Sequence, residues 1–234
     1  MIEEVLLPVD DGTAMVAFVA RHKKLVNPPG VMIYHDAFGV NEHFKDVAVR
    51  YAAEGFVAIV PELFHRTGTK VQLPFGDLEG CRPHTSKVTI DTINADVRAA
   101  YTWLTENGVA RDRVACTGFC LGGRVTYLAN AILPLAGAVA YYAGALHQPA
   151  YTALAPAQHA PIVMIWAGLD KHLAAADRRA TADAMTAAGK VHTQIVFSDA
   201  EHVIFCNDRN EYHPAAARQS WALSREYYRT QGLI

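Results

Sequence analysis

Short apolar runs that suit β-strands alternate with amphipathic segments that suit α-helices along most of the chain. The strand-like runs are 31–34, 56–60, 113–117, 137–142, 161–167 and 192–197. Helical spacing of apolar residues marks 41–54, 88–107, 121–133, 174–188 and 214–230, and a glycine directly follows each of the first two. This alternation predicts an α/β fold, with a mostly parallel sheet covered by helices on both faces.

Two segments depart from this alternation. Near the N-terminus, 4–8 and 13–20 are strand-like and flank an Asp-Asp-Gly sequence, which predicts a β-hairpin. Residues 61–87 contain scattered Gly, Pro, Thr and His, and we expect them to be irregular. A long loop beside a rigid sheet is often functional. No repeat or linker interrupts the 234 residues, so a single domain over 1–234 is predicted.

Composition limits the classes of partner. A net charge of −2, with 19% charged residues, gives no basic field for nucleic acid or for an anionic membrane. The N-terminus has no signal-peptide pattern and no apolar stretch is long enough for a membrane span, so a cytoplasmic protein is expected. The four cysteines have no zinc-type or Cys-x-x-Cys spacing, and we expect free thiols in a reducing compartment. No metal or cofactor motif is present in the sequence, and neither group is expected.

A cysteine stands in a distinctive turn between a predicted strand and a predicted helix. The sequence Gly118-Phe119-Cys120-Leu121-Gly122 predicts a nucleophile elbow, with Cys120 at the position where serine is commoner. The turn is so sharp that its neighbours must be small, and the helix N-terminus favours a thiolate and an oxyanion. The alternative is an inert buried cysteine beside packing glycines. The other cysteines are interpreted as a core residue (Cys116) and as incidental thiols (Cys81 and Cys206).

A nucleophilic thiol needs a base, and the base needs a group that orients it. In α/β-hydrolases these groups follow the nucleophile in the order acid, then histidine. Asp170 comes just after the strand-like run 161–167, and His202 comes one short loop after 192–197. Ligands bind at the carboxyl ends of parallel strands, so both side chains should reach the same edge as Cys120. The alternatives are His172 as the base, and Asp199 or Glu201 as the acid.

Six short segments of the chain are distinctive in combination: 35–41 (HDAFGVN), 61–64 (PELF), 118–124 (GFCLGGR), 141–144 (YYAG), 168–170 (GLD) and 200–202 (AEH). On these segments the chain resembles the dienelactone hydrolase family, and the resemblance covers nearly its whole length. It implies an α/β-hydrolase fold and a catalytic triad of Cys120, His202 and Asp170. It also implies an oxyanion hole formed by the backbone N–H groups of Ala37 and Leu121.

The chain departs from this family at two positions. Members similar to the prototype carry Glu where this chain has Asp36; that Glu holds the resting thiol and accepts its proton, and the shorter Asp36 is the candidate for the same task. They also carry an arginine that binds the substrate carboxylate, four residues after the histidine, where this chain has Cys206. The nearest arginine is Arg209, and Arg82 is the candidate for a second carboxylate-binding arginine. Further candidate substrate contacts are Phe38, Tyr142 and Phe75.

Three functions are compatible with these residues. The first is a cysteine-dependent hydrolase of small esters or lactones that forms an acyl-enzyme, active as a monomer or a dimer. The second is the same triad acting on thioesters or organophosphate triesters. The third is a non-catalytic protein that binds a small molecule in the retained pocket.

Overall fold

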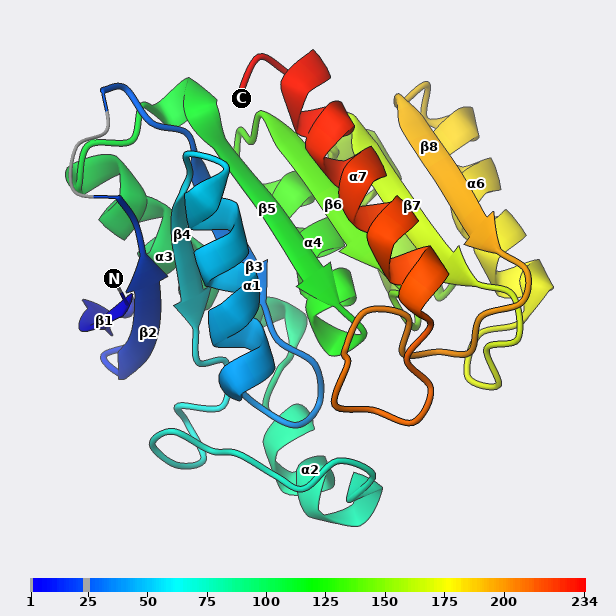
Figure 1. The fold of residues 1–234 in the computed structure, drawn as a ribbon, viewed down its shortest axis with the longest axis horizontal. Coiled ribbons are helices and arrows are strands. Elements are labelled where there is room, and N and C mark those ends of the chain that lie inside the picture. The colour runs from blue at the N-terminus through cyan, green and yellow to red at the C-terminus, as the bar shows by residue number, and fades with distance from the viewer. Residues whose placement is uncertain (1, 23–25) are drawn as a thin grey trace.

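The computed structural model describes residues 2–22 and 26–234. Within them, one sheet has the strand order β1-β2-β4-β3-β5-β6-β7-β8 (Figure 1). Strands β1, β2 and β4 pair antiparallel, and every pair from β4-β3 to β7-β8 is parallel. The strands are β1 (Ile2–Pro8), β2 (Ala14–Ala20), β3 (Gly30–Tyr34), β4 (Val57–Pro61), β5 (Val114–Phe119), β6 (Gly137–Tyr141), β7 (Ile162–Ala167) and β8 (His192–Phe197).

Helices cover both faces of this sheet. In Figure 1, α1 and α7 lie in front of it, α3, α4 and α6 lie behind it, and α2 lies beyond the carboxyl ends of the parallel strands. The helices are α1 (Glu42–Ala53), α2 (Leu78–Thr85), α3 (Ile90–Glu106), α4 (Leu121–Ile132), α5 (Pro149–Thr152), α6 (Ala175–Ala187) and α7 (Pro214–Thr230). The predicted α/β class with a mostly parallel sheet is confirmed.

The two faces bury two separate apolar clusters. Along β3, Met32 and Tyr34 belong to the cluster under α3 and α4, whereas Val31 and Ile33 belong to the cluster under α1 and α7. Because both faces of such a strand are covered, its sequence is apolar without interruption, which is the pattern that predicted it. Cys116 lies in the first cluster and is fully buried, as predicted.

The expectation that 61–87 is irregular is wrong at α2. The Asp77 side chain accepts a hydrogen bond from the Gly80 N–H at 2.8 Å and caps this helix. Of the helix residues, Cys81 alone is buried, and Pro83 lies inside the helix. A short helix with one buried residue has no apolar periodicity, and proline argues against helix, so neither usual signal marked it. The short helix α5 also went unpredicted.

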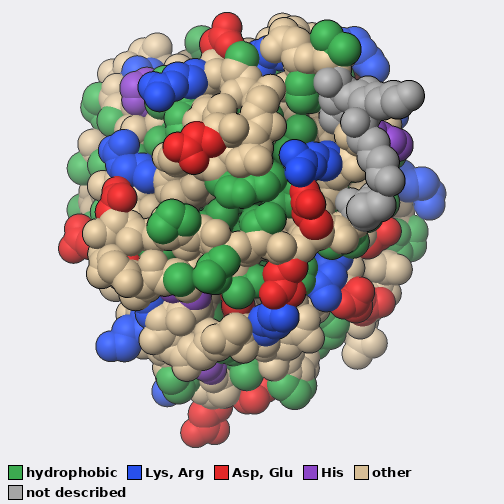
Figure 2. All heavy atoms as spheres, turned by 90° about the vertical axis from the view of Figure 1, so that its left-hand side faces the viewer, with side chains coloured by type: hydrophobic (Ala, Val, Ile, Leu, Met, Phe, Trp, Pro, Cys, Tyr) green, Lys and Arg blue, Asp and Glu red, His purple; other side chains and the backbone are tan. Residues whose placement is uncertain are grey.

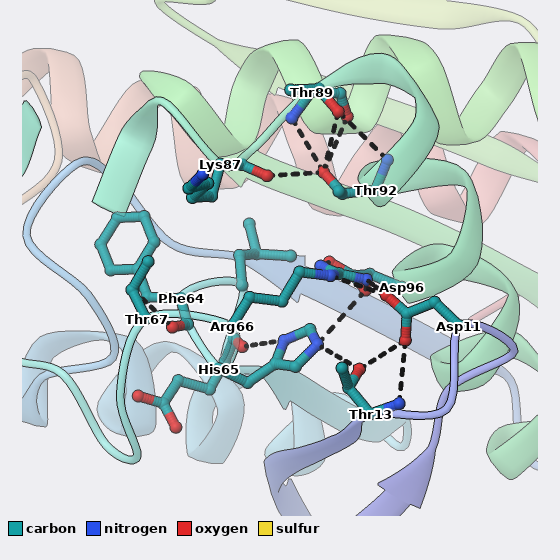
Figure 3. Close-up of polar contacts among 12 residues, drawn as sticks. Asp11, Thr13, Phe64, His65, Arg66, Thr67, Lys87, Thr89, Thr92 and Asp96 are labelled. Carbon is teal, nitrogen blue, oxygen red and sulfur yellow. Dashed lines mark hydrogen bonds and ion pairs between the residues drawn. The ribbon is translucent and has the colours of Figure 1, made fainter. Parts of the chain in front are cut away.

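A polar network fixes the segment that follows β4 (Figure 3). The Arg66 guanidinium donates to both carboxylate oxygens of Asp96 on α3, at 2.7 and 2.9 Å, and to Asp11 at 2.7 Å. Nε2 of the neighbouring His65 lies 3.0 Å from the Thr13 hydroxyl. Asp11 and Thr13 belong to the β1–β2 hairpin region, so the network ties this segment to the hairpin and to α3.

The side of the molecule that carries β1 has a mixed surface. Figure 2 looks at that side and shows hydrophobic side chains interspersed with acidic and basic ones. On β1 the ion pairs Glu3–Arg21 and Glu4–Lys70, at 2.7 and 2.8 Å, accompany the exposed side chain of Leu6. Charged residues on an edge strand disfavour pairing with another sheet. Across the described residues, no helix combines the length and the apolar character needed to cross a membrane.

Candidate active site

The predicted site residues gather at the carboxyl ends of the parallel strands. Cys120 follows β5, Asp170 follows β7, His202 follows β8, and Asp36 and Ala37 follow β3. In Figure 1 these strand ends point toward α2 and toward the loops that precede α7. This is the edge at which open parallel sheets bind ligands.

The turn at Cys120 is strained. This residue has a φ of 56° and a ψ of −110°, and a positive φ is uncommon for residues other than glycine. Its N–H donates to the Tyr141 carbonyl at 3.0 Å. A Cβ atom on Gly118 would lie 2.1 Å from the Gly122 carbonyl oxygen, and one on Gly122 would lie 2.0 Å from the Tyr34 carbonyl oxygen. Close backbone approach therefore explains both glycines of the predicted elbow.

His202 is paired with Asp170. Its Nδ1 lies 2.6 Å from Oδ2 of Asp170, while Oδ1 accepts the His172 N–H at 2.8 Å. Burial would raise the pKa of Asp170, but the hydrogen bond and charge of His202 hold it below its ordinary value. Burial would likewise lower the pKa of His202, but interactions with Cys120 and Asp170 raise it well above its ordinary value. The His202 ring therefore binds a proton more tightly than an ordinary histidine does.

The alternatives for base and acid are not brought together in this way. The exposed His172 packs its ring against that of His202, with centroids 5.2 Å apart, and reaches Asp170 through its backbone. Asp199 lies 3.4 Å from Nε2 of His213, and Glu201 is exposed. Among the described residues, Asp170 is the carboxylate that contacts His202.

Asp36 is buried beside the pair. Its Oδ1 accepts the Phe38 N–H at 2.9 Å, whereas the cap of α1 is Asn41. Asp36 therefore closes its own turn and does not cap the helix. Burial raises the pKa of Asp36 to about 6, although the Phe38 N–H and the charges of Arg209 and His202 oppose the rise. A carboxyl group with this pKa exchanges its proton near neutral pH.

Two of the candidate substrate contacts, Tyr142 and Arg82, come from different segments of the chain. Tyr142 has a φ of 36°, and its ring packs edge-on against His202 at 4.9 Å, so it lies at the site. Trp166, which lies on β7, is fully buried, and its indole N–H donates to the Gln194 side-chain oxygen at 3.0 Å, so it belongs to the core. Arg82 is exposed on α2.

An aromatic pair with an arginine comes from three different segments. The rings of Phe38 and Phe75 meet edge to face at 5.7 Å. The Arg209 guanidinium lies 5.2 Å from the Phe38 ring and 5.1 Å from the Phe75 ring, and 3.2 Å from the Glu211 carboxylate. A cavity of about 200 Å³ adjoins this contact, lined in part by Phe75, Arg209 and Glu211.

The thiols interpreted as incidental lie close to the site. Burial, with a smaller contribution from Asp36, raises the pKa of Cys206 to about 11. Burial, followed by the charges of Asp77 and Cys120, raises the pKa of Cys81. All four cysteines are free, as predicted. In residues 2–22 and 26–234, no three His, Cys, Asp or Glu side chains are grouped as metal ligands would be.

Two buried residues of the family-like segments were assigned no role from the sequence. Glu62 accepts hydrogen bonds from the N–H groups of Lys70, at 2.7 Å, and Val71. This places Val71 against Gly39, where a Cβ atom would lie 2.0 Å from the Val71 carbonyl oxygen. His35, also fully buried, contacts the backbone carbonyl of Asp36 after β3 and the backbone N–H of Leu63 after β4. The motifs contained both residues, but their partners are backbone groups that no sequence pattern marks.

A mostly parallel sheet with a strained nucleophile-type turn after a central strand is the α/β-hydrolase fold. Within that fold, the chain belongs to the dienelactone hydrolase family, whose model matches residues 15–231. The chain is thus an ester or lactone hydrolase, and the hypothesis of a non-catalytic binding protein is wrong.

Individual relatives agree with this assignment. A “Putative carboxymethylenebutenolidase” of Escherichia coli (strain K12) is 33% identical over 230 residues, covering 94% of this chain and 84% of the relative. The crystal structure of a “Putative Dienelactone Hydrolase” from Klebsiella pneumoniae subsp. pneumoniae MGH 78578 has a TM-score of 0.89 and 30% identity, covering 97% and 98% of the two chains. A dienelactone hydrolase-like promiscuous phosphotriesterase from metagenomic libraries has a TM-score of 0.86 at 20% identity over 99% and 98%, a likeness of fold alone.

Proposed function

We propose that Cys120, His202 and Asp170 form a catalytic triad that hydrolyses small esters or lactones through an acyl-enzyme. The observation that carries this proposal is the 2.6 Å contact between Asp170 and His202 Nδ1, next to the strained turn of Cys120. That contact engages Nδ1 and leaves Nε2 of His202 for the thiol. The name carboxymethylenebutenolidase, which the curated relatives carry, favours a lactone or related ester as the substrate class.

The proposed reaction has two halves. The Cys120 thiolate attacks the carbonyl carbon, and the electron pair of the C=O bond moves to oxygen, where the N–H groups of Ala37 and Leu121 stabilise the oxyanion. Collapse of this intermediate expels the alcohol oxygen, which takes the proton from His202. A water molecule then attacks the thioester carbonyl, and His202 accepts a proton from it. The C–S bond breaks, which regenerates the Cys120 thiolate and releases the carboxylic acid.

In this proposal Asp36 replaces the glutamate of other family members. Its carboxyl group is buried, and its pKa of about 6 suits a group that holds or accepts the thiol proton as substrate arrives. Its Oδ1 is engaged by the Phe38 N–H, which leaves Oδ2 for this task. The shorter side chain requires the thiol to approach closely or a water molecule to intervene.

The decisive experiment compares the Cys120→Ala and Cys81→Ala variants on p-nitrophenyl esters, a lactone, a dienelactone and a phosphotriester. Removing a triad member costs more than about a thousandfold in turnover. We therefore expect ester and lactone hydrolysis to fall by at least that factor in Cys120→Ala and to persist in Cys81→Ala. Retention of more than a thousandth of the activity in Cys120→Ala rules out the proposed nucleophile. Faster turnover of the phosphotriester than of every ester rules out the proposed substrate class.

A further inference from the structure

His35 is a fully buried histidine whose two ring nitrogens both contact backbone. Nδ1 lies 2.7 Å from the carbonyl oxygen of Asp36, and Nε2 accepts the N–H of Leu63 at 3.1 Å. The ring packs edge-on against Phe64, with centroids 4.8 Å apart, and against Phe44 at 6.3 Å. The histidine thus joins the loop after β3 to the loop after β4.

These contacts fix the tautomer. A backbone N–H is always a donor, so Nε2 must be the acceptor in the bond with Leu63. Nδ1 therefore carries the proton and donates it to the Asp36 carbonyl. Burial lowers the pKa of His35 to about 4, although the Asp36 carbonyl opposes the change, so the ring stays neutral near neutral pH.

The bond to the Asp36 carbonyl has a consequence for Ala37. The C=O of Asp36 and the N–H of Ala37 belong to one planar trans peptide, so they point in opposite directions. Holding the carbonyl on the His35 side therefore turns the Ala37 N–H to the other side. The Asp36 side chain bonds the Phe38 N–H at 2.9 Å and fixes the next peptide as well.

We infer that His35 is a positioning residue, which holds the Ala37 N–H in the oxyanion hole by anchoring the carbonyl of the same peptide. This inference rests on the proposed function, in which Ala37 donates to the oxyanion. A donor of this kind is effective because it is already oriented when charge develops, and losing one lowers turnover by 10² to 10³ or so. Losing its anchor should cost less, because the neighbouring peptide stays fixed.

Two amide substitutions separate the two hydrogen bonds. In His35→Asn the side-chain amide nitrogen takes the place of Nδ1 and keeps a donor for the Asp36 carbonyl. In His35→Gln the amide oxygen takes the place of Nε2 and keeps an acceptor for Leu63, while the donor to Asp36 is lost. Each variant leaves one buried backbone group unpaired, so the pair is matched in kind.

We expect kcat for p-nitrophenyl acetate to fall about tenfold further in His35→Gln than in His35→Asn, with similar KM values. Iodoacetamide alkylation of Cys120 should proceed at the same rate in both variants, because displacement at a saturated carbon forms no oxyanion. Equal kcat values in the two variants overturn the inference. A parallel loss of alkylation overturns it too, because that marks general damage to the site.

A measurement on the unmodified protein keeps the test independent of folding in the variants. Long-range ¹H–¹⁵N NMR correlations should show His35 as the Nδ1–H tautomer at pH 7, and the Nε2–H tautomer would overturn the inference. Failure of the proposed function has a different signature. In that case the wild-type chain shows no Cys120-dependent hydrolysis, whatever the tautomer of His35.

Discussion

Cys120 has a backbone conformation that few side chains adopt, and the surroundings hold it there. The φ of 56° is maintained by the N–H bond to Tyr141 and by two glycines, Gly118 and Gly122, at which a Cβ atom would overlap a backbone oxygen. Strain of this kind persists only where the surrounding structure over-determines it, and such residues cluster at active sites. The residue type and its flanking glycines were readable from sequence because the geometry leaves no other choice at Gly118 and Gly122.

The raised pKa of the Asp36 carboxyl group leads to a prediction about how the free energy of unfolding depends on pH. The pKa of Asp36 is raised from 3.8 to about 6, so the folded chain binds this proton more tightly than the unfolded chain does. The free energy of unfolding should therefore decline as pH rises from about 4 to about 6, by about 3 kcal/mol in total. In Asp36→Asn, whose side chain can still accept the Phe38 N–H, this decline should vanish. Urea denaturation at pH 4, 5, 6 and 7 measures it.

The same substitution tests the proposed role of Asp36 in activating the thiol. Asp36→Asn should slow the acylation burst with an activated ester by at least tenfold, as loss of a proton-transfer group commonly costs 10² or more. Stopped-flow kinetics measure the burst, and iodoacetamide labelling follows the thiol separately. Near-normal rates of acylation and alkylation would contradict the proposed role in thiol activation. Asp36 would then serve only to close its turn through the bond to the Phe38 N–H.

The helices and strands of the chain differ in how well the sequence predicts them. Each buried parallel strand is a continuous apolar run and each long helix has an apolar stripe, so their positions followed from periodicity. The short helix α2 buries Cys81 alone and contains Pro83, so its formation depends on the Asp77 cap and on its position over the strand ends. The contacts of His35 show the same limit, because its partner Leu63 lies 28 residues away. The positions of the strand ends predicted that Asp170 and His202 lie close together. They did not predict the contacts that fix the surrounding loops.

The junction between β3 and α4 allows a matched test of close packing. A Cβ on Gly122 would lie 2.0 Å from the Tyr34 carbonyl oxygen and 2.7 Å from that of His35, so backbone must move. Gly144 has no atom within 4 Å of the corresponding position. We expect Gly122→Ala to lower the free energy of unfolding by at least about 2 kcal/mol, and Gly144→Ala to change it by less than about 0.5 kcal/mol. Equal thermal midpoints for the two variants would contradict this account of the elbow.

At the scale of the whole molecule, segments distant in sequence build the wall beside the proposed triad. The Arg66 network holds the chain after β4, Glu62 holds residues 70 and 71, and Phe75 then meets Phe38 and Arg209. Arg209 belongs to the loop that follows His202, so this wall depends on three loops at once. Such a contact is a product of tertiary structure, which explains why the sequence named Phe38 and Phe75 as candidates but not their meeting with Arg209.

This wall leads to a prediction about substrate charge. The family's carboxylate-binding arginine is replaced by buried Cys206, and Arg209 is stacked on two rings and paired with Glu211. A missing charge-assisted hydrogen bond weakens binding by about 1.5–3 kcal/mol, or roughly ten- to a hundredfold. Neutral, moderately apolar esters should therefore have a higher kcat/KM than carboxylate-bearing lactones of similar size. A dienelactone acid and its methyl ester form the matched substrates.

A single substitution supplies the control for this prediction. Cys206→Arg restores a guanidinium at the family position, and it should shift the ratio of kcat/KM toward the acid by about tenfold or more, because bidentate arginine suits a carboxylate. If the unmodified chain already prefers the acid, the prediction fails and another cation must bind the carboxylate. Arg209→Gln and Arg82→Gln would then identify it: loss of the preference in the first would assign the role to the aromatic wall, and loss in the second would assign it to α2.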